Sequence, residues 1–96
     1  MDPEIPDIFI ADVVTSTAGR DAGQFFYVIK EESSILYLAN GKDRTLDKPK
    51  RKKRKHVQKV LRSETRVAHK LRAGDKVLNG ELRRDLAILA RENASE

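Results

Sequence analysis

The chain contains no cysteine and no tryptophan, and only five of its 96 residues are aromatic. The absence of cysteine excludes disulfides, thiolate metal sites and thiol catalysis, and it agrees with a reducing compartment. No apolar run approaches the ~18 residues that a membrane-spanning helix needs. The acidic start, MDPEIPD, lacks the apolar stretch of a secretory signal. We therefore expect a cytoplasmic protein without a membrane partner.

Residue sets for catalysis or metal binding are also scarce. The chain has two histidines, His56 and His69. They lie far apart in the sequence and no cysteine or carboxylate cluster accompanies them, which is a poor metal-binding pattern. We find no paired acids, no nucleophile next to a base and no glycine-rich loop opening a helix. The sequence therefore predicts no enzyme activity, no catalytic residue, no metal site and no cofactor.

Positive charge, by contrast, is concentrated in one segment. The whole chain has a net charge of +5. Residues 42–62 contain eleven lysines and arginines against two aspartates, which gives +9, so the remaining residues together carry −4. A chain of this length forms a single domain. One strongly basic segment in an otherwise mildly acidic domain is typical of a protein that meets a polyanion through one face.

The apolar and β-branched residues of the first two thirds predict short strands. We expect one strand ending near Thr15, a second over residues 24–32, a third over 35–39, a short fourth at Arg44–Leu46 and a fifth over 56–61. The pair Asn40-Gly41 is a strong signal for a tight turn after the third strand. Five short strands with closely spaced turns indicate a small closed barrel, which leaves no exposed sheet edge.

The hydrophobic period becomes helical after residue 62. A short helix is expected between a cap at Ser63 and a terminating Gly74, and a longer one begins at Asn79. Leu82, Leu86 and Leu89 form an apolar stripe on the second helix, which we expect to pack on the barrel. The predicted organisation is a barrel over residues 1–62, with a basic loop at 48–55, and a helical extension over 63–96.

The stretch GRDAG, residues 19–23, lies between the first two strands. Gly19 and Gly23 would allow a backbone conformation that other residues avoid, and Arg20 between them could fork onto a phosphate. Asp21 could orient Arg20 or bond to the turn backbone. The residues alone leave two interpretations open, a simple hairpin turn or a turn that presents Arg20 to a polyanion.

The stretch DVVTSTAGRDAGQFFYVI resembles the KOW motif, a strand-loop-strand unit of ribosomal proteins and transcription elongation factors. The following ANGKDRTLDKPKRKKRKHVQ is similar to the continuation in KOW-type large-subunit ribosomal proteins, the fourteen-e group, and in their short bacterial relatives. Ala22 departs from the motif, where lysine is common. The resemblance covers about residues 12–58. It implies an SH3-like β-barrel that binds RNA, usually ribosomal RNA.

The run KPKRKKRKH, residues 48–56, completes the candidate interface. Its like charges repel one another unless phosphates neutralise them. Because few aromatic residues remain outside the expected core, we expect contacts to the backbone and shape of structured RNA more than base readout. The candidate RNA-binding residues are Arg20, Lys42, Arg44, Lys48, Lys50, Arg51, Lys52, Lys53, Arg54, Lys55, His56 and Lys59, with Gly19, Asp21 and Gly23 forming the turn.

The sequence thus predicts a monomeric RNA-binding protein associated with the ribosome or its assembly, with ribosomal RNA and ribosomal proteins as partners. Two alternatives stay open. Some KOW domains are protein-interaction modules of transcription or translation complexes. A basic barrel could also bind double-stranded DNA without sequence preference.

Overall fold

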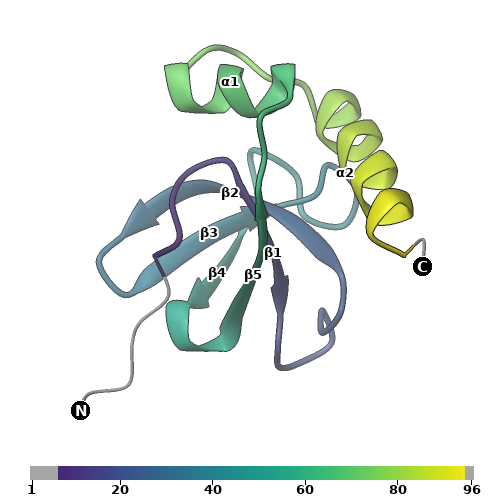
Figure 1. Cartoon of the computed structure of the whole chain (residues 1–96). Coiled ribbons are helices and arrows are strands. Elements are labelled where there is room, and N and C mark those ends of the chain that lie inside the picture. Colours follow the sequence, from purple (N-terminus) through teal and green to yellow (C-terminus); the bar gives the residue numbers. More distant parts are fainter. Residues whose placement is uncertain (1–6, 95–96) are drawn as a thin grey trace.

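The computed structural model describes residues 7–94, so the acidic start lies outside the described residues except for Asp7. Five strands precede two helices (Figure 1). They are β1 (Asp12–Ser16), β2 (Phe25–Glu32), β3 (Ile35–Ala39), β4 (Lys50–Lys53), β5 (Val57–Arg62), α1 (Arg66–Ala73) and α2 (Asn79–Ala94). Neighbouring strands are antiparallel, in the order β4-β3-β2-β1-β5. The predicted mainly β fold, with a small barrel-like sheet and C-terminal helices, is confirmed.

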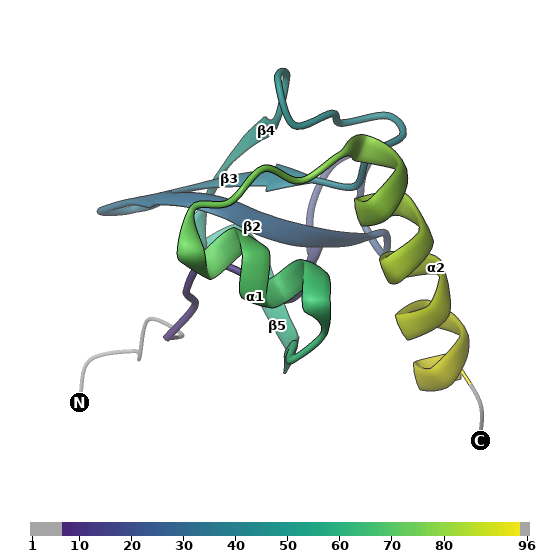
Figure 2. The same cartoon turned by 90° about the horizontal axis from the view of Figure 1, so that it is seen from above.

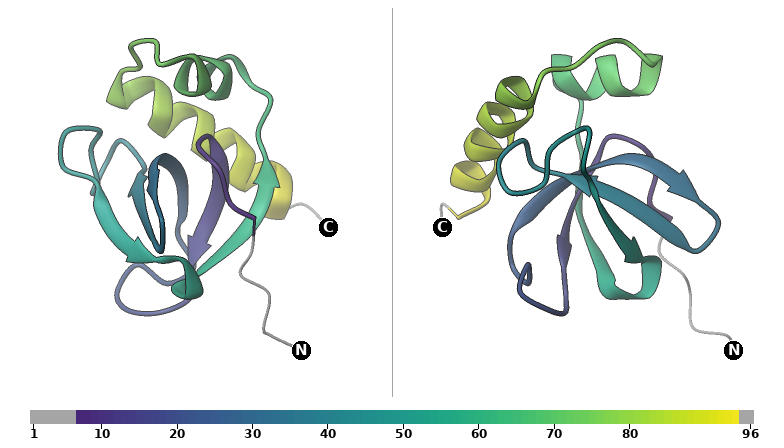
Figure 3. Two further views of the ribbon diagram at one scale, coloured as in Figure 1. Left: turned by 90° about the vertical axis from the view of Figure 1, so that its left-hand side faces the viewer. Right: turned by 180° about the vertical axis from the view of Figure 1, so that it is seen from behind.

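The sheet curls but does not close. A 3-10 helix of three residues, η1 (Arg54–His56), joins the edge strands β4 and β5 directly (Figure 3). Within residues 7–94 no ladder pairs β4 with β5, so the expectation of full closure was wrong. β4 has only four residues, and all of them are lysine or arginine. Charged side chains on an edge strand discourage its pairing with another chain. The charges of β4 therefore do what closure of the barrel was expected to do.

The fourth strand lies later in the chain than expected. Arg44–Leu46 forms part of a loop, in which the Asn40 Oδ1 accepts hydrogen bonds from the backbone N–H of Lys42 at 2.9 Å and of Arg44 at 3.0 Å. The strand is instead Lys50–Lys53, inside the segment predicted to be a loop. Its side chains alternate between half-buried and exposed, and the half-buried ones stand opposite the buried Leu36 and Leu38 of β3. Long aliphatic stems can cover apolar surface while their charged ends reach water.

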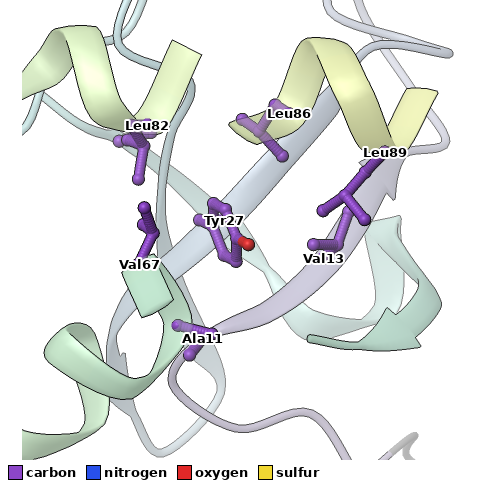
Figure 4. Close-up of a cluster of buried hydrophobic side chains, with 9 residues drawn as sticks. Ala11, Val13, Tyr27, Val67, Leu82, Leu86 and Leu89 are labelled. Carbon is purple, nitrogen blue, oxygen red and sulfur yellow. The ribbon is translucent and has the colours of Figure 1, made fainter. Parts of the chain in front are cut away.

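Two clusters of buried apolar side chains cover the two faces of the sheet. The inner cluster comprises Ile8, Val14, Phe26, Val28, Leu36, Leu38 and Val57. The outer cluster joins the sheet to both helices, and Figure 4 shows Leu86 and Leu89 of α2 beside Tyr27 and Val13, with Leu82 facing Val67 of α1. These three leucines are at most 9 % exposed. The predicted apolar stripe of α2 is therefore part of the core.

The start of α1 differs from the sequence-based expectation. Thr65, not Ser63, is the N-cap, since its Oγ1 accepts a hydrogen bond of 3.2 Å from the backbone N–H of Ala68. Ser63 is buried, and its hydroxyl is 2.8 Å from the hydroxyl of Tyr27. The predicted end of the helix is correct, because Gly74 adopts the left-handed conformation at φ 77°. Ser63 lies two residues before this N-cap, and its hydroxyl contacts the buried Tyr27 instead of capping α1.

Tyr27 ties the sheet to the helices through a polar network inside the outer cluster. Its hydroxyl donates to the carboxylate of Asp85 on α2, and the same carboxylate accepts from Thr65 Oγ1 at 2.8 Å. Burial, followed by the hydrogen bond to Asp85, raises the pKa of Tyr27 to about 12. The network links β2, the start of α1 and the middle of α2.

We expect Tyr27→Phe to lower the free energy of unfolding by about 1–3 kcal/mol, because Asp85 and Ser63 would lose a buried partner. In the wild type, the folded state holds the Tyr27 proton more tightly than the unfolded state, whose tyrosine has an ordinary pKa of 10.0. Stability from this group is therefore complete below pH 10 and is lost as the pH rises toward 12. Urea unfolding at pH 8 to 12 should show this loss in the wild type, and Tyr27→Phe should lack this component of it.

Candidate nucleic-acid interface

The loop between β1 and β2 is built around its two glycines, as expected. Gly19 and Gly23 have φ angles of 83° and 86°, in the left-handed region that glycine adopts readily. The Ala22 N–H donates to the Gly19 carbonyl at 3.2 Å, and the Gly23 N–H donates to the Ser16 carbonyl at 3.1 Å. Arg20 is exposed on this compact turn. The loop thus holds its arginine outward on a backbone with internal hydrogen bonds.

The basic segment contacts this loop at three points along its length. Lys52 Nζ donates to the Ala18 carbonyl at 3.1 Å. The Arg44 guanidinium lies 3.5 Å from the Asp21 carboxylate, which is almost buried. The Thr17 N–H donates to the carbonyl of His56 at 2.9 Å. The two stretches lie side by side although they are more than twenty residues apart in the sequence (Figure 3).

Sheet topology explains why these stretches meet. The β1–β2 loop and the β3–β4 loop leave the same end of the antiparallel sheet, because alternate hairpins turn at the same end. β5 also begins there, with Val57 paired to Ser16. β4 ends opposite Ile35, beside the turn between β2 and β3, and η1 carries the chain from there to the start of β5. Segments 17–24 and 40–49 therefore lie at one end of the curled sheet, and His56 reaches them at the end of η1.

Four of the predicted RNA-binding cations make contacts within the protein. Arg54 has the most, since its guanidinium donates to the carbonyls of Ser33 at 2.6 Å and Ile8 at 3.0 Å and lies 3.7 Å from the Glu31 carboxylate. Lys59 pairs with the buried carboxylate of Asp12 at 3.2 Å. Arg44 and Lys52 brace the β1–β2 loop. These four side chains stabilise the fold. Their internal contacts could not be predicted by counting charges along the sequence.

The other predicted cations remain at the surface. Arg20, Lys42, Lys48, Arg51, Lys53 and Lys55 are exposed, while Lys50 and His56 are half-buried. Among residues 7–94, no carboxylate lies within 4.0 Å of the lysines and arginines of this group. Asp21 pairs with Arg44 rather than with Arg20. Arg20, Lys42 and Lys48 belong to loops 17–24 and 40–49, and unpaired cations on these neighbouring loops can neutralise several phosphates of a polyanion.

Tyr37 is a surface residue that the sequence analysis assigned to no site. It lies on β3, half-buried, with the Nζ of Lys30 at 5.2 Å and the Cζ of Arg51 at 5.9 Å from its ring centroid. The alternation of Leu36 and Leu38 into the inner cluster was the available signal, because it directs Tyr37 to the other face. An aromatic ring between two cations adds a stacking surface to the basic one.

Other functional features are limited in the part of the chain that the structure describes. There, no group of three or more histidine, cysteine, aspartate or glutamate side chains is arranged to hold a metal ion. Neither α1 nor α2 has the length and apolar character needed to cross a lipid bilayer. No protein-family model matches the chain, and no curated protein shows significant sequence similarity to it. The interface is therefore defined by its own geometry and charge.

Proposed function

We propose that this protein is a non-catalytic RNA-binding module of the KOW type, and that it binds structured RNA with the surface around the β1–β2 loop. The observation that carries the proposal is the three-point contact between loop 17–24 and the basic segment. These contacts hold the loop in place and leave the neighbouring cations unpaired. Phosphate neutralisation is the chemistry that such a surface supports.

Ribosomal RNA is the RNA that we propose, with the ribosome or its assembly in the cytoplasm as the setting. Support comes from the resemblance of residues 12–58 to KOW-type ribosomal proteins and from the small barrel-like fold. Sedimentation of a cell lysate on a density gradient tests this part. We expect the protein to move with ribosomal particles at low salt and to leave them at high salt, and exclusive recovery at the top of the gradient would contradict it.

Salt dependence of binding to an RNA hairpin tests the interface itself. With about five engaged cations, the logarithm of the affinity should fall with the logarithm of the salt concentration at a slope near −4 to −5. The triple variant R20Q/K42Q/K48Q, at exposed positions of loops 17–24 and 40–49, should reduce this slope by about 2 to 3, since each lost phosphate contact removes about 0.9. Fluorescence anisotropy at several salt concentrations measures both.

The matched control is R66Q/R84Q/R91Q, which removes the same charge from exposed positions on α1 and α2. Its slope should equal that of the wild type. Equal losses in both triple variants would show that net charge, and not this surface, drives binding. A wild-type slope near zero would favour a protein-interaction module. Equal affinity for RNA and DNA duplexes of the same length would favour a general polyanion binder.

A further inference from the structure

Tyr37 occupies the middle of an exposed part of the sheet. Its neighbours on the adjacent strands are Lys30 of β2 and Arg51 of β4, both directly opposite in the strand register. Both cations lie within 6 Å of the ring centroid, so the ring is flanked on two sides. This arrangement combines an apolar ring face with two positive charges.

The helices leave this part of the sheet uncovered. α2 and α1 pack over Tyr27, Ala39 and Val13, at the other end of the same face. A bulge between Val28 and Lys30 separates the covered half of β2 from the exposed half. Figure 2 shows that neither helix lies over β4. Lys30 and Arg51 are exposed and Tyr37 is half-buried.

The ring orientation of Tyr37 is fixed by a hydrogen bond. Its hydroxyl donates to Glu32 Oε1 at 2.8 Å, and the other carboxylate oxygen of Glu32 lies 3.3 Å from Lys30 Nζ. The hydrogen bond from Tyr37, followed by that from Lys30, lowers the pKa of Glu32. Glu32 is therefore an ionised acceptor at neutral pH. A ring held in this way is already oriented before any ligand arrives, which reduces the entropy lost on binding.

A cleft rich in cations lies at the turn between β2 and β3, where Lys53 pairs with Ile35, two residues before Tyr37. It has a volume of about 540 Å³ and is lined by Ser33, Ser34, Lys53, Arg54 and Lys55. Lys53 stands opposite Ile35, two residues along β4 from Arg51, so both side chains share one face. Arg54 fixes the wall, since its backbone N–H donates to the Ser34 carbonyl at 2.9 Å and its Nε to the Ser33 carbonyl. Lys53 and Lys55 are exposed at this cleft.

We propose that Tyr37 stacks an unpaired nucleobase of RNA and that Lys53 and Lys55 hold the adjoining phosphate in the cleft. Aromatic side chains stack on bases of any sequence, and neighbouring cations follow the backbone. The inference rests on the proposed RNA-binding function and extends it. The bound RNA must then contain unpaired nucleotides next to its structured part, so contacts are not limited to backbone and shape.

The probe is a short single-stranded oligouridylate with one central 2-aminopurine, whose fluorescence decreases when it stacks on an aromatic ring. The wild type should quench this fluorescence on binding, a readout that needs no variant. Tyr37→Leu, which keeps an apolar side chain, should abolish the quenching and weaken binding about tenfold or more. Tyr37→Phe keeps the ring and should stay within about twofold of the wild type.

A blunt-ended RNA duplex, which has no unpaired base, separates the inference from the proposed function. Tyr37→Leu should bind the duplex as tightly as the wild type does. If Tyr37→Leu also binds the single strand as the wild type does, or if the wild type does not quench, the stacking role is refuted and the RNA-binding function stands. Equal weakening toward both RNAs would likewise refute a base contact. Failure of the wild type to bind either RNA would refute both.

Discussion

Replacing Gly41 with alanine should lower the free energy of unfolding by about 3–5 kcal/mol, a loss at the upper end for a single substitution. Gly41 has a φ angle of 77°, and an added Cβ would lie 2.2 Å from the carbonyl oxygen of Asn79. That oxygen belongs to the first turn of α2 and cannot rotate away. The left-handed conformation adds about 1–2 kcal/mol for a residue with a Cβ. The start of α2 would therefore have to move away from the β3–β4 loop.

Gly23→Ala is the matched control. Gly23 has a φ angle of 86°, but no atom lies within 4 Å of the position that a Cβ would take. This substitution should cost only the conformational strain of about 1–2 kcal/mol. Urea unfolding followed by circular dichroism measures both variants. If the two alanines destabilise the protein equally, the close approach of α2 to Gly41 contributes nothing and the explanation is wrong.

Leu82→Ala should destabilise the protein by about 2–5 kcal/mol. The Leu82 side chain is fully buried, and it packs in the outer cluster with Val67 and Tyr27 (Figure 4). Truncation removes apolar contacts and leaves a cavity between α1, α2 and the sheet. Because a helix and a sheet both border that cavity, the site can collapse only partly.

Ile88→Ala provides the comparison within the same helix, since Ile88 is 45 % exposed. It should change the stability by less than about 1 kcal/mol. The two variants are compared by urea unfolding at several protein concentrations. If Leu82→Ala left stability unchanged but abolished self-association, the stripe would be a partner surface and not part of the core.

The sequence was sufficient for the elements whose hydrophobic period is regular. β1, β2 and β3 contain apolar or β-branched residues, and α2 has leucines at helical spacing. β4 was missed because its residues are all charged, so no apolar alternation marks it. It forms because β3 offers Leu36 and Leu38 to the stems of Lys50 and Lys52. The apolar residues that favour this strand lie in β3, so the sequence of residues 50–53 alone does not indicate it.

Some features of the candidate site could likewise be predicted from the sequence, and others could not. The left-handed glycines of GRDAG and the exposure of Arg20 follow from local sequence, because they depend on backbone conformation at single positions. The internal role of Arg54 depends on Ile8, which is 46 residues away in the chain. Lys59 is similarly engaged by Asp12. Counting charges along a segment estimates how much phosphate it could neutralise, but only tertiary contacts show which side chains remain available.

The two hydrophobic clusters also become complete at different stages of synthesis. The inner cluster draws only on residues 8–57, whereas the outer one needs Val67, Ala68 and the leucines of α2. A chain emerging from its N-terminus can therefore complete the curled sheet, with loop 17–24 and the basic segment, while α2 is still being translated. Tyr27 and Val13 stay uncovered during that interval. A nascent chain would thus have its cationic surface formed while the outer face of the sheet is still not covered by α2.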